Sequence, residues 1–216
     1  MYDALSNRLE RCYTGVLNDV MRAMGLRDFV LPPELRPLFP DRRLAGPAFT
    51  ILGHVDPDAD PHATLLEWTG LLSRAKPGHV WVSQPCDRRV AHMGELSAAA
   101  LKAKGLRGCV IDGYVRDSGR LLELGFDIFC RGFTPRDVVG WWLPKATDTD
   151  IQVGEVVICP GDYLVGDRDG LIRVPADRAA EVVAAAETAI ATENKVRTAI
   201  LQGMDPQRAY ITYGKF

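Results

Sequence analysis

The sequence predicts a mixed α/β domain, and three of its features support this class. Short apolar stretches typical of strands alternate with longer stretches in which apolar residues recur at helical spacing. The 216 residues are 47% hydrophobic and 25% charged, which is ordinary for a globular domain with a large core. No internal repeat or low-complexity linker divides the chain. We therefore expect one domain over residues 1–216, with short helical extensions at its termini.

The first part of the chain predicts helices and strands in turn. Apolar residues at helical spacing predict a helix over residues 3–25, which ends at Gly25. Residues 31–47 contain five prolines and are expected to be irregular. The elements that follow are a strand over 48–55, a loop over 56–62, a helix over 63–74, a turn at Pro77–Gly78 and a strand over 79–84.

The second part continues this alternation and ends in a long helix. A helix is expected over residues 94–104, because Gly105 follows it as a typical C-terminal signal. The next elements are a strand over 108–112, a loop and helix that end near Leu124, a strand over 126–130, an irregular region around Trp141–Trp142, strands within 153–175 that are joined by turns, and a helix from Pro175 to about Gln202.

Charge and composition exclude several classes of partner. The net charge is −2 and no basic stripe is present, so we expect no nucleic-acid partner. No apolar stretch is long enough to span a membrane, and the N-terminal residues lack the apolar region of a signal peptide. The five cysteines show no CxxC spacing, which favours reduced thiols in a cytoplasmic protein.

The unit from Gly94 to Asp117 predicts a binding site. A helix that begins at Gly94 leaves its first N–H groups without partners inside the helix, and such a terminus attracts carboxylate or phosphate. The following strand can return the chain so that Arg116 and Asp117 lie beside that helix start. Arg116 would then bind an anionic oxygen, and Asp117 would offer a hard oxygen ligand. An ordinary helix cap with a surface salt bridge explains the same residues equally well.

The stretch GELSAAALKAKGLRGCVIDGYVRD, at residues 94–117, resembles the signature of the RraA-like family. This family includes the 4-hydroxy-4-methyl-2-oxoglutarate/4-carboxy-4-hydroxy-2-oxoadipate aldolases, which are divalent-metal pyruvate aldolases. Residues 44–51, 76–82 and 160–175 resemble the same family, so the likeness covers about residues 12 to 203. It implies a layered α/β/β/α fold of the phosphohistidine swivelling-domain type, assembled as a homotrimer or homohexamer.

The resemblance also implies roles for residues of the central unit. The turn formed by Gly94, Glu95, Leu96 and Ser97 would bind the pyruvate moiety, largely through backbone amides. Arg116 would bind the substrate and stabilise its enolate, and Asp117 would ligate Mg²⁺ or Mn²⁺.

Two acids outside this unit would complete the site. Asp19 and Glu193 match the positions from which a neighbouring subunit contributes carboxylates in the family. The chain departs from the family before the helix at 63–74, where aldolases commonly carry Asp-Asn and this sequence has Pro61–His62. His62 would take the place of the asparagine as a substrate-binding residue. The loop around Trp141–Trp142 also departs, so the substrate can differ.

The implied function is cleavage of a 4-hydroxy-2-oxo acid to pyruvate. The metal and Arg116 would stabilise the pyruvate enolate, and Glu95 or a neighbour's carboxylate would position the water that accepts the 4-hydroxyl proton. Oxaloacetate decarboxylation passes through the same enolate and is an expected companion activity. The group at C4, the physiological metal and the pathway stay open.

Two other functions also stay open. One is a non-catalytic regulator that binds a protein partner, although the family's regulators lack the acid that Asp117 supplies here. The other is a hydratase or dehydratase of a sugar-derived acid at the same metal site. A methyltransferase, another label used in the family, lacks support because no glycine-rich GxGxG turn follows a strand.

Overall fold

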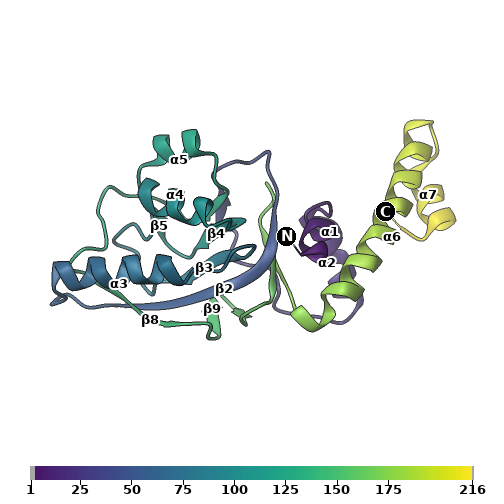
Figure 1. Cartoon of the computed structure of the whole chain (residues 1–216). Coiled ribbons are helices and arrows are strands. Elements are labelled where there is room, and N and C mark those ends of the chain that lie inside the picture. Colours follow the sequence, from purple (N-terminus) through teal and green to yellow (C-terminus); the bar gives the residue numbers. More distant parts are fainter. Residues whose placement is uncertain (1–2, 216) are drawn as a thin grey trace.

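The computed structural model describes residues 3–215, and a curled eight-stranded sheet runs through these residues (Figure 1). Residues 1, 2 and 216 of the expected domain lie outside the described residues. The strands follow the order β1 (Arg36–Pro37), β6 (Ile128–Cys130), β4 (Gly108–Ile111), β3 (Val80–Gln84), β2 (Leu44–Val55), β11 (Tyr163–Gly166) and β12 (Leu171–Val174), and β8 (Trp142–Thr147) also pairs with β2. The central strands β2, β3, β4 and β6 are parallel.

The long strand β2 makes the sheet curl. Residues 44–47 of β2 pair with β11, residues 48–52 pair with β3, and residues 51–55 pair with β8. The pairing with β8 shifts register between Leu52 and Gly53, where the ring of Trp142 packs against the backbone. A Cβ atom on Gly53 would lie 1.8 Å from that ring, so only glycine fits there.

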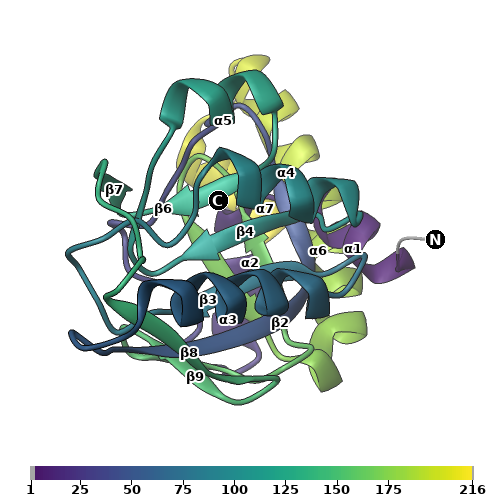
Figure 2. The ribbon, with the colours of Figure 1, turned by 60° about the vertical axis from the view of Figure 1, so that its left-hand side comes forward.

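Helices cover both outer faces (Figures 1 and 2). One face carries α3 (Pro61–Arg74), α4 (Glu95–Ala103) and α5 (Ser118–Leu124). The opposite side carries α1 (Ala4–Leu9), α2 (Thr14–Ala23) and α6 (Ala179–Leu201), which follows the 3₁₀ turn η1 (Ala176–Arg178). The remaining elements are the pair β9 (Ile151–Val153) with β10 (Val156–Ile158), the pair β5 (Tyr114–Val115) with β7 (Gly132–Phe133), and α7 (Pro206–Tyr213).

Three apolar clusters separate the four layers. Alternate residues of β3 face opposite sides of the sheet. Trp81 belongs to the cluster under α3, α4 and α5, whereas Val80 and Val82 belong to the cluster between the two halves of the sheet. The third cluster joins β11 and β12 to the helices α1, α2 and α6. The predicted α/β/β/α layering is therefore confirmed.

The predicted helix over residues 3–25 was wrong in one respect, because it is two helices. The break lies before Thr14, whose backbone N–H and Oγ1 each donate a hydrogen bond of 2.8 Å to the carboxylate of Asp167. Asp167 also accepts from the N–H of Asp169 at 3.0 Å, within the turn that joins β11 to β12. A turn far along the sequence thus fixes where α2 begins.

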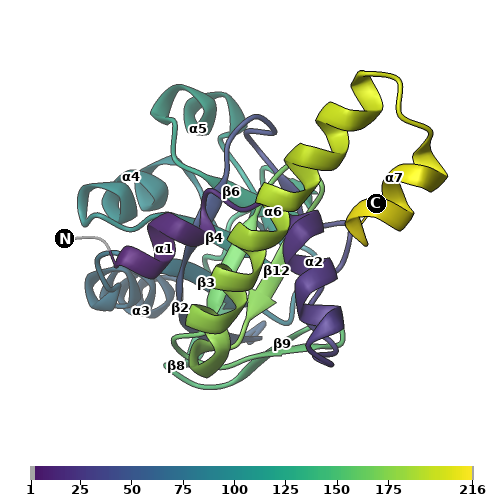
Figure 3. The same ribbon diagram turned by 90° about the vertical axis from the view of Figure 1, so that its right-hand side faces the viewer.

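A strand in the second half of the chain also differs from the sequence prediction. Strand β8 occupies part of the region around Trp141–Trp142 that we expected to be irregular. Helix α7 follows α6 and folds back along its projecting end (Figure 3). In the described part of the chain, no helix has the length and apolar character needed to cross a membrane.

Candidate active site

The loop after β5 lies directly beside the start of α4. The N–H of Arg116 donates to the carbonyl oxygen of Met93 at 2.9 Å, which joins the two segments through their backbones. The first helical residue of α4, Glu95, donates its N–H to Oδ2 of Asp117 at 3.1 Å. The structure therefore brings together Gly94, Glu95, Arg116 and Asp117, as the order of helix, strand and loop predicted.

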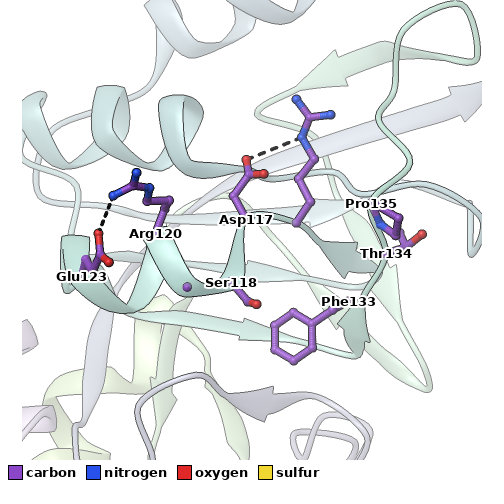
Figure 4. A pocket seen from close by; sticks show the side chains of 9 residues that line it. Asp117, Ser118, Arg120, Glu123, Phe133, Thr134 and Pro135 are labelled. Atoms are coloured by element: carbon purple, nitrogen blue, oxygen red, sulfur yellow. Dashed lines mark hydrogen bonds and ion pairs between the residues drawn. The ribbon is translucent and has the colours of Figure 1, made fainter.

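Arg116 lies between two carboxylates. Its Nε is 3.6 Å from Oδ2 of Asp117, and its Nη1 is 3.1 Å from Oδ2 of Asp137. Figure 4 shows the first of these ion pairs as a dashed line that begins at Asp117. Asp137 holds its own position by accepting the N–H of Val139 at 3.2 Å. The two carboxylates fix the plane of the guanidinium and leave part of it to face solvent.

Asp117 has an unusual backbone conformation. Its φ of 59° and ψ of 36° lie in the left-handed region, which aspartate tolerates better than most residues but which still costs free energy. This conformation ends the loop and begins α5, so it sets where the carboxylate points. The second oxygen of that carboxylate, Oδ1, has no hydrogen-bond or ion-pair partner among residues 3–215.

Gly94 leaves room here for the side chains of Arg116 and Asp117. Its φ of −139° is extended backbone that any residue adopts. A Cβ atom would lie 2.7 Å from Oδ2 of Asp117 and 3.2 Å from Nε of Arg116. The absent side chain therefore lets the loop approach the helix start.

Replacing Gly94 with alanine should lower kcat/KM for any substrate of this site by about tenfold or more, because Arg116 and Asp117 must move by several tenths of an ångström. Gly119→Ala is the matched control, since a Cβ atom there meets nothing within 4 Å. Steady-state kinetics and thermal unfolding of both variants check the prediction. Equal activity of the two variants would contradict a role for this close approach.

Two clefts open on either side of the pair formed by Arg116 and Asp117. The first, called the α4 cleft, has a volume of about 550 Å³ and is lined by residues that include Gly94, Ser97, Arg116, Asp117 and Asp137. The second, called the α5 cleft, has a volume of about 580 Å³ and is lined by Arg116, Asp117, Ser118, Gly119, Arg120, Glu123, Phe133, Thr134 and Pro135 (Figure 4).

The α4 cleft has the features of an anion-binding site. Leu96 and Ser97 line it, and no residue within 3–215 accepts a hydrogen bond from their backbone N–H groups. These donors lie in the first turn of α4, where the helix dipole adds positive potential. With Arg116 in the same cleft, they can bind the carboxylate of a small acid.

A buried carboxylate near this cleft, that of Asp87, was not predicted from the sequence. It accepts hydrogen bonds from the N–H groups of Arg89 and Val90, from Nε2 of His92 and from the indole of Trp141. Burial opposes ionisation, but these hydrogen bonds together lower the pKa of Asp87 to about 2. The ionised carboxylate thus joins the loop that leads into α4 to the segment that ends in Trp141.

That segment carries Asp137, which the sequence also did not reveal. The N–H of Ala91 donates to the carbonyl of Arg136 at 2.8 Å, so backbone and side-chain bonds hold the two segments together. The position of Asp137 against Arg116 therefore depends on residues from three separate stretches of sequence. No local pattern signals such an arrangement.

Asp19 and Glu193 lie together, but away from Arg116. Nζ of Lys215 is 2.9 Å from Oδ2 of Asp19 and 3.2 Å from Oε1 of Glu193. The hydrogen bond from Lys215 lowers the pKa of Asp19. All three residues line a cavity of about 490 Å³ between α2 and α6, on the opposite side of the molecule from α4 (Figures 1 and 3). Within one chain they do not reach the α4 cleft.

His62 lies at the second residue of α3 and is exposed. It lines neither cleft, whereas Leu65, one turn later in the same helix, lines the α4 cleft. Its predicted contact with a substrate stays a prediction. Trp68 of α3 lines the α4 cleft and donates its indole N–H to Oγ of Ser97 at 2.9 Å.

Comparison with known proteins identifies the family. A family model described as Aldolase/RraA, of the RraA-like type, matches residues 14–173. This match covers well over half of the chain. The chain belongs to the RraA-like family. The family membership predicted from the motif is therefore confirmed.

The matches to relatives differ in how much of each chain they cover. A protein of Halalkalibacterium halodurans, named "Putative 4-hydroxy-4-methyl-2-oxoglutarate aldolase", is 30% identical over 184 residues, which are 84% of this chain and 83% of that one. A protein of Methanocaldococcus jannaschii is 33% identical over 112 residues, 52% of this chain, and the match spans about half, 53%, of its own length.

Solved structures of similar proteins share the fold. A Pseudomonas syringae protein has a TM-score of 0.83 at 26% identity, with 95% of this chain and 96% of that chain covered. RraAS2 of Streptomyces coelicolor has a TM-score of 0.79 at 29% identity, with 90% and 96% covered, and is described as an unusual member of the RNase ES inhibitor RraA protein family.

The residues present fit a hydrated divalent cation. No group of three His, Cys, Asp or Glu side chains within residues 3–215 is arranged to hold a metal ion. Asp117, however, offers an oxygen without a partner next to the amides of α4. Mg²⁺ and Mn²⁺ accept such a single carboxylate when water and substrate oxygens complete their coordination.

Proposed function

We propose that this protein is a divalent-metal-dependent pyruvate aldolase that cleaves a 4-hydroxy-2-oxo acid. One observation carries the proposal: unpartnered amides of α4, the guanidinium of Arg116 and the carboxylate of Asp117 converge on the α4 cleft. Membership of the RraA-like family and the aldolase name of the relative from H. halodurans support it. The proposal assigns a carbon–carbon lyase activity to the α4 cleft.

The residues of the cleft can perform the cleavage in order. The amides of Leu96 and Ser97 bind the carboxylate of the 2-oxo acid, and Arg116 donates to the oxygen on which enolate charge develops. Glu95, which begins α4 but lies outside the lining of the cleft, or a carboxylate of a neighbouring copy would hold the water that accepts the proton of the 4-hydroxyl group. The C3–C4 bond then breaks, the carbonyl product leaves, and a proton added at C3 gives pyruvate.

Asp117 would hold the metal. When bound, Mg²⁺ or Mn²⁺ supplies positive charge to the carboxylate and keto oxygens of the substrate. Loss of CO₂ from oxaloacetate leaves the same pyruvate enolate, so we propose oxaloacetate decarboxylation as a second activity of the same residues.

We further propose that the active site is completed between subunits of a homotrimer or homohexamer. Asp19 and Glu193 lie side by side on a face that cannot reach the α4 cleft of its own chain. A neighbouring copy would bring this acidic pair to the cleft. There its negative charge would help to hold metal-bound water or the distal end of the substrate.

Mixing two inactive variants should restore activity if the site is shared. Arg116→Ala and Glu193→Gln proteins are each expected to be inactive, and subunit exchange creates sites that combine one intact half from each. Activity after exchange should return to about a quarter or less of wild type, because random mixing makes few intact pairs. Confirmed exchange without any returning activity would show that both residues act within one chain.

The substrate class is tested by pyruvate release. Purified protein is incubated with a panel of 4-hydroxy-2-oxo acids and with oxaloacetate, in the presence of Mg²⁺, Mn²⁺ or excess chelator, and pyruvate is measured with lactate dehydrogenase. We expect release from at least one acid, dependent on the metal. Gain or loss of water without pyruvate would favour a hydratase, and no reaction of any acid would favour a regulator that binds a protein partner.

A further inference from the structure

The wall of the α4 cleft beyond Arg116 is apolar. It is formed by three elements that lie far apart in the sequence: α3, the start of α4 and the segment after Asp137. Much of this surface is open to a ligand, because Leu96 is 81% exposed and Leu65 is 47% exposed. Its large apolar side chains include Leu65, Trp68, Leu72, Leu96 and Val139.

Two neutral polar side chains of α3 in this wall, Trp68 and Thr69, already use their donors. The indole N–H of Trp68 donates to Oγ of Ser97 at 2.9 Å. The hydroxyl of Thr69 donates to the carbonyl of Leu65 at 2.8 Å. Neither Trp68 nor Thr69 is therefore free to donate to a ligand without losing a bond within the protein.

The charges of the cleft are unequal. Among the described residues that line it, Arg116 is the single cation, and it faces the carboxylates of both Asp117 and Asp137. One carboxylate on a ligand can bind Arg116 and the amides of α4. A second carboxylate at the far end would lose hydration against the apolar wall and lie near Asp137 without a cation to pair with it.

We propose that the α4 cleft binds 2-oxo acids with an uncharged, apolar distal end more tightly than it binds dicarboxylic acids, oxaloacetate included. This inference rests on the proposed function, because it assumes that the 2-oxo acid head binds at Arg116. The substrate in the name of the H. halodurans relative is a glutarate, which carries two carboxylates. The α4 cleft of this chain instead favours a substrate whose tail carries no carboxylate.

Two stable 2-oxo acids of similar length test the selection. 4-Methyl-2-oxopentanoate and 2-oxoglutarate share the head and differ in the tail, which ends in an isopropyl group in the first and in a methylene group with a carboxylate in the second. Titration calorimetry of the protein with saturating Mg²⁺ should give a Kd at least about tenfold lower for 4-methyl-2-oxopentanoate, since burial and like charge both oppose the second carboxylate. Binding is measured without turnover, because neither compound has a 4-hydroxyl group.

Two variants and one control test which residues cause the difference between the two Kd values. Asp137→Asn retains an oxygen for Arg116 but removes the charge, so the ratio of the two Kd values should fall by about threefold or more. Leu65→Arg places a cation on the half-exposed wall and should reverse the preference. Glu155→Gln is the control, because it removes an exposed acid between β9 and β10, and its ratio should equal that of wild type.

Equal or tighter binding of 2-oxoglutarate to wild type would overturn the inference, and so would a ratio that Asp137→Asn and Leu65→Arg both leave unchanged. Such results would leave the proposed function intact as long as pyruvate is released from a 4-hydroxy-2-oxo dicarboxylic acid. If the proposed function is wrong, a different result is expected, namely no release of pyruvate from any of the acids. The two outcomes are therefore distinguishable.

Discussion

Replacing Arg116 with alanine should lower kcat by about two orders of magnitude, which corresponds to about 3 kcal/mol of lost transition-state stabilisation. The guanidinium faces the α4 cleft between Asp117 and Asp137, where the enolate oxygen of the substrate would lie. Negative charge on that oxygen develops as the C3–C4 bond breaks. Loss of the Arg116 guanidinium therefore lowers kcat as well as the affinity for substrate.

Arg116→Lys should recover only a small part of this activity. An ammonium group cannot keep the contacts of Nε and Nη1 with the two carboxylates at the same time. Arg120→Ala is the matched control, because Arg120 lines the neighbouring α5 cleft and pairs with Glu123 on the surface. Steady-state kinetics decide the matter, and an Arg116→Ala protein with unchanged kcat and only a higher KM would show simple binding instead.

Asp117→Asn should raise the metal concentration required for half-maximal activity by about tenfold or more, because a neutral amide is a far weaker ligand for Mg²⁺ or Mn²⁺. Asparagine tolerates the left-handed backbone, and its side-chain oxygen can still accept the N–H of Glu95. The variant should therefore fold normally. Metal titrations of activity, with protein first stripped by a chelator, measure the effect.

Asp137→Asn serves as the control for that titration. Asp137 also contacts Arg116, but it lies on the other side of the guanidinium and is not the proposed ligand. We expect its metal requirement to match wild type, and chelator should abolish the activity of wild-type protein reversibly. Full wild-type activity in excess chelator would contradict the metal-dependent mechanism.

The sequence was most informative where neighbouring elements build the site. Gly94 marks the start of α4, and the strand that follows α4 returns the chain so that Arg116 and Asp117 meet that start. A helix, a strand and a loop of this kind leave few arrangements, because parallel strands of one sheet align their ends. The stretch from Gly94 to Asp117 could therefore be predicted as one site.

Contacts between segments that are distant in sequence could not be predicted from local patterns. Asp137 reaches Arg116 because Asp87 and backbone bonds hold its segment in place, and no periodic pattern marks that segment. The division of the first helix depends on Asp167, a residue of the turn between β11 and β12. Lys215, which lies between Asp19 and Glu193, is similarly remote in sequence. Tertiary packing decides each of these positions.

Exchange of the methyl protons of pyruvate for deuterium tests the central claim most directly, because it needs no knowledge of the group at C4. A site that stabilises the pyruvate enolate must also form it from pyruvate, since the last step of the cleavage is reversible. In D₂O with Mg²⁺ or Mn²⁺, we expect wild-type protein to remove the methyl signal of pyruvate from the proton NMR spectrum far faster than buffer does. Arg116→Ala and chelated protein should lose this activity. Exchange no faster than in buffer, with correctly folded and metal-loaded protein, would contradict the account.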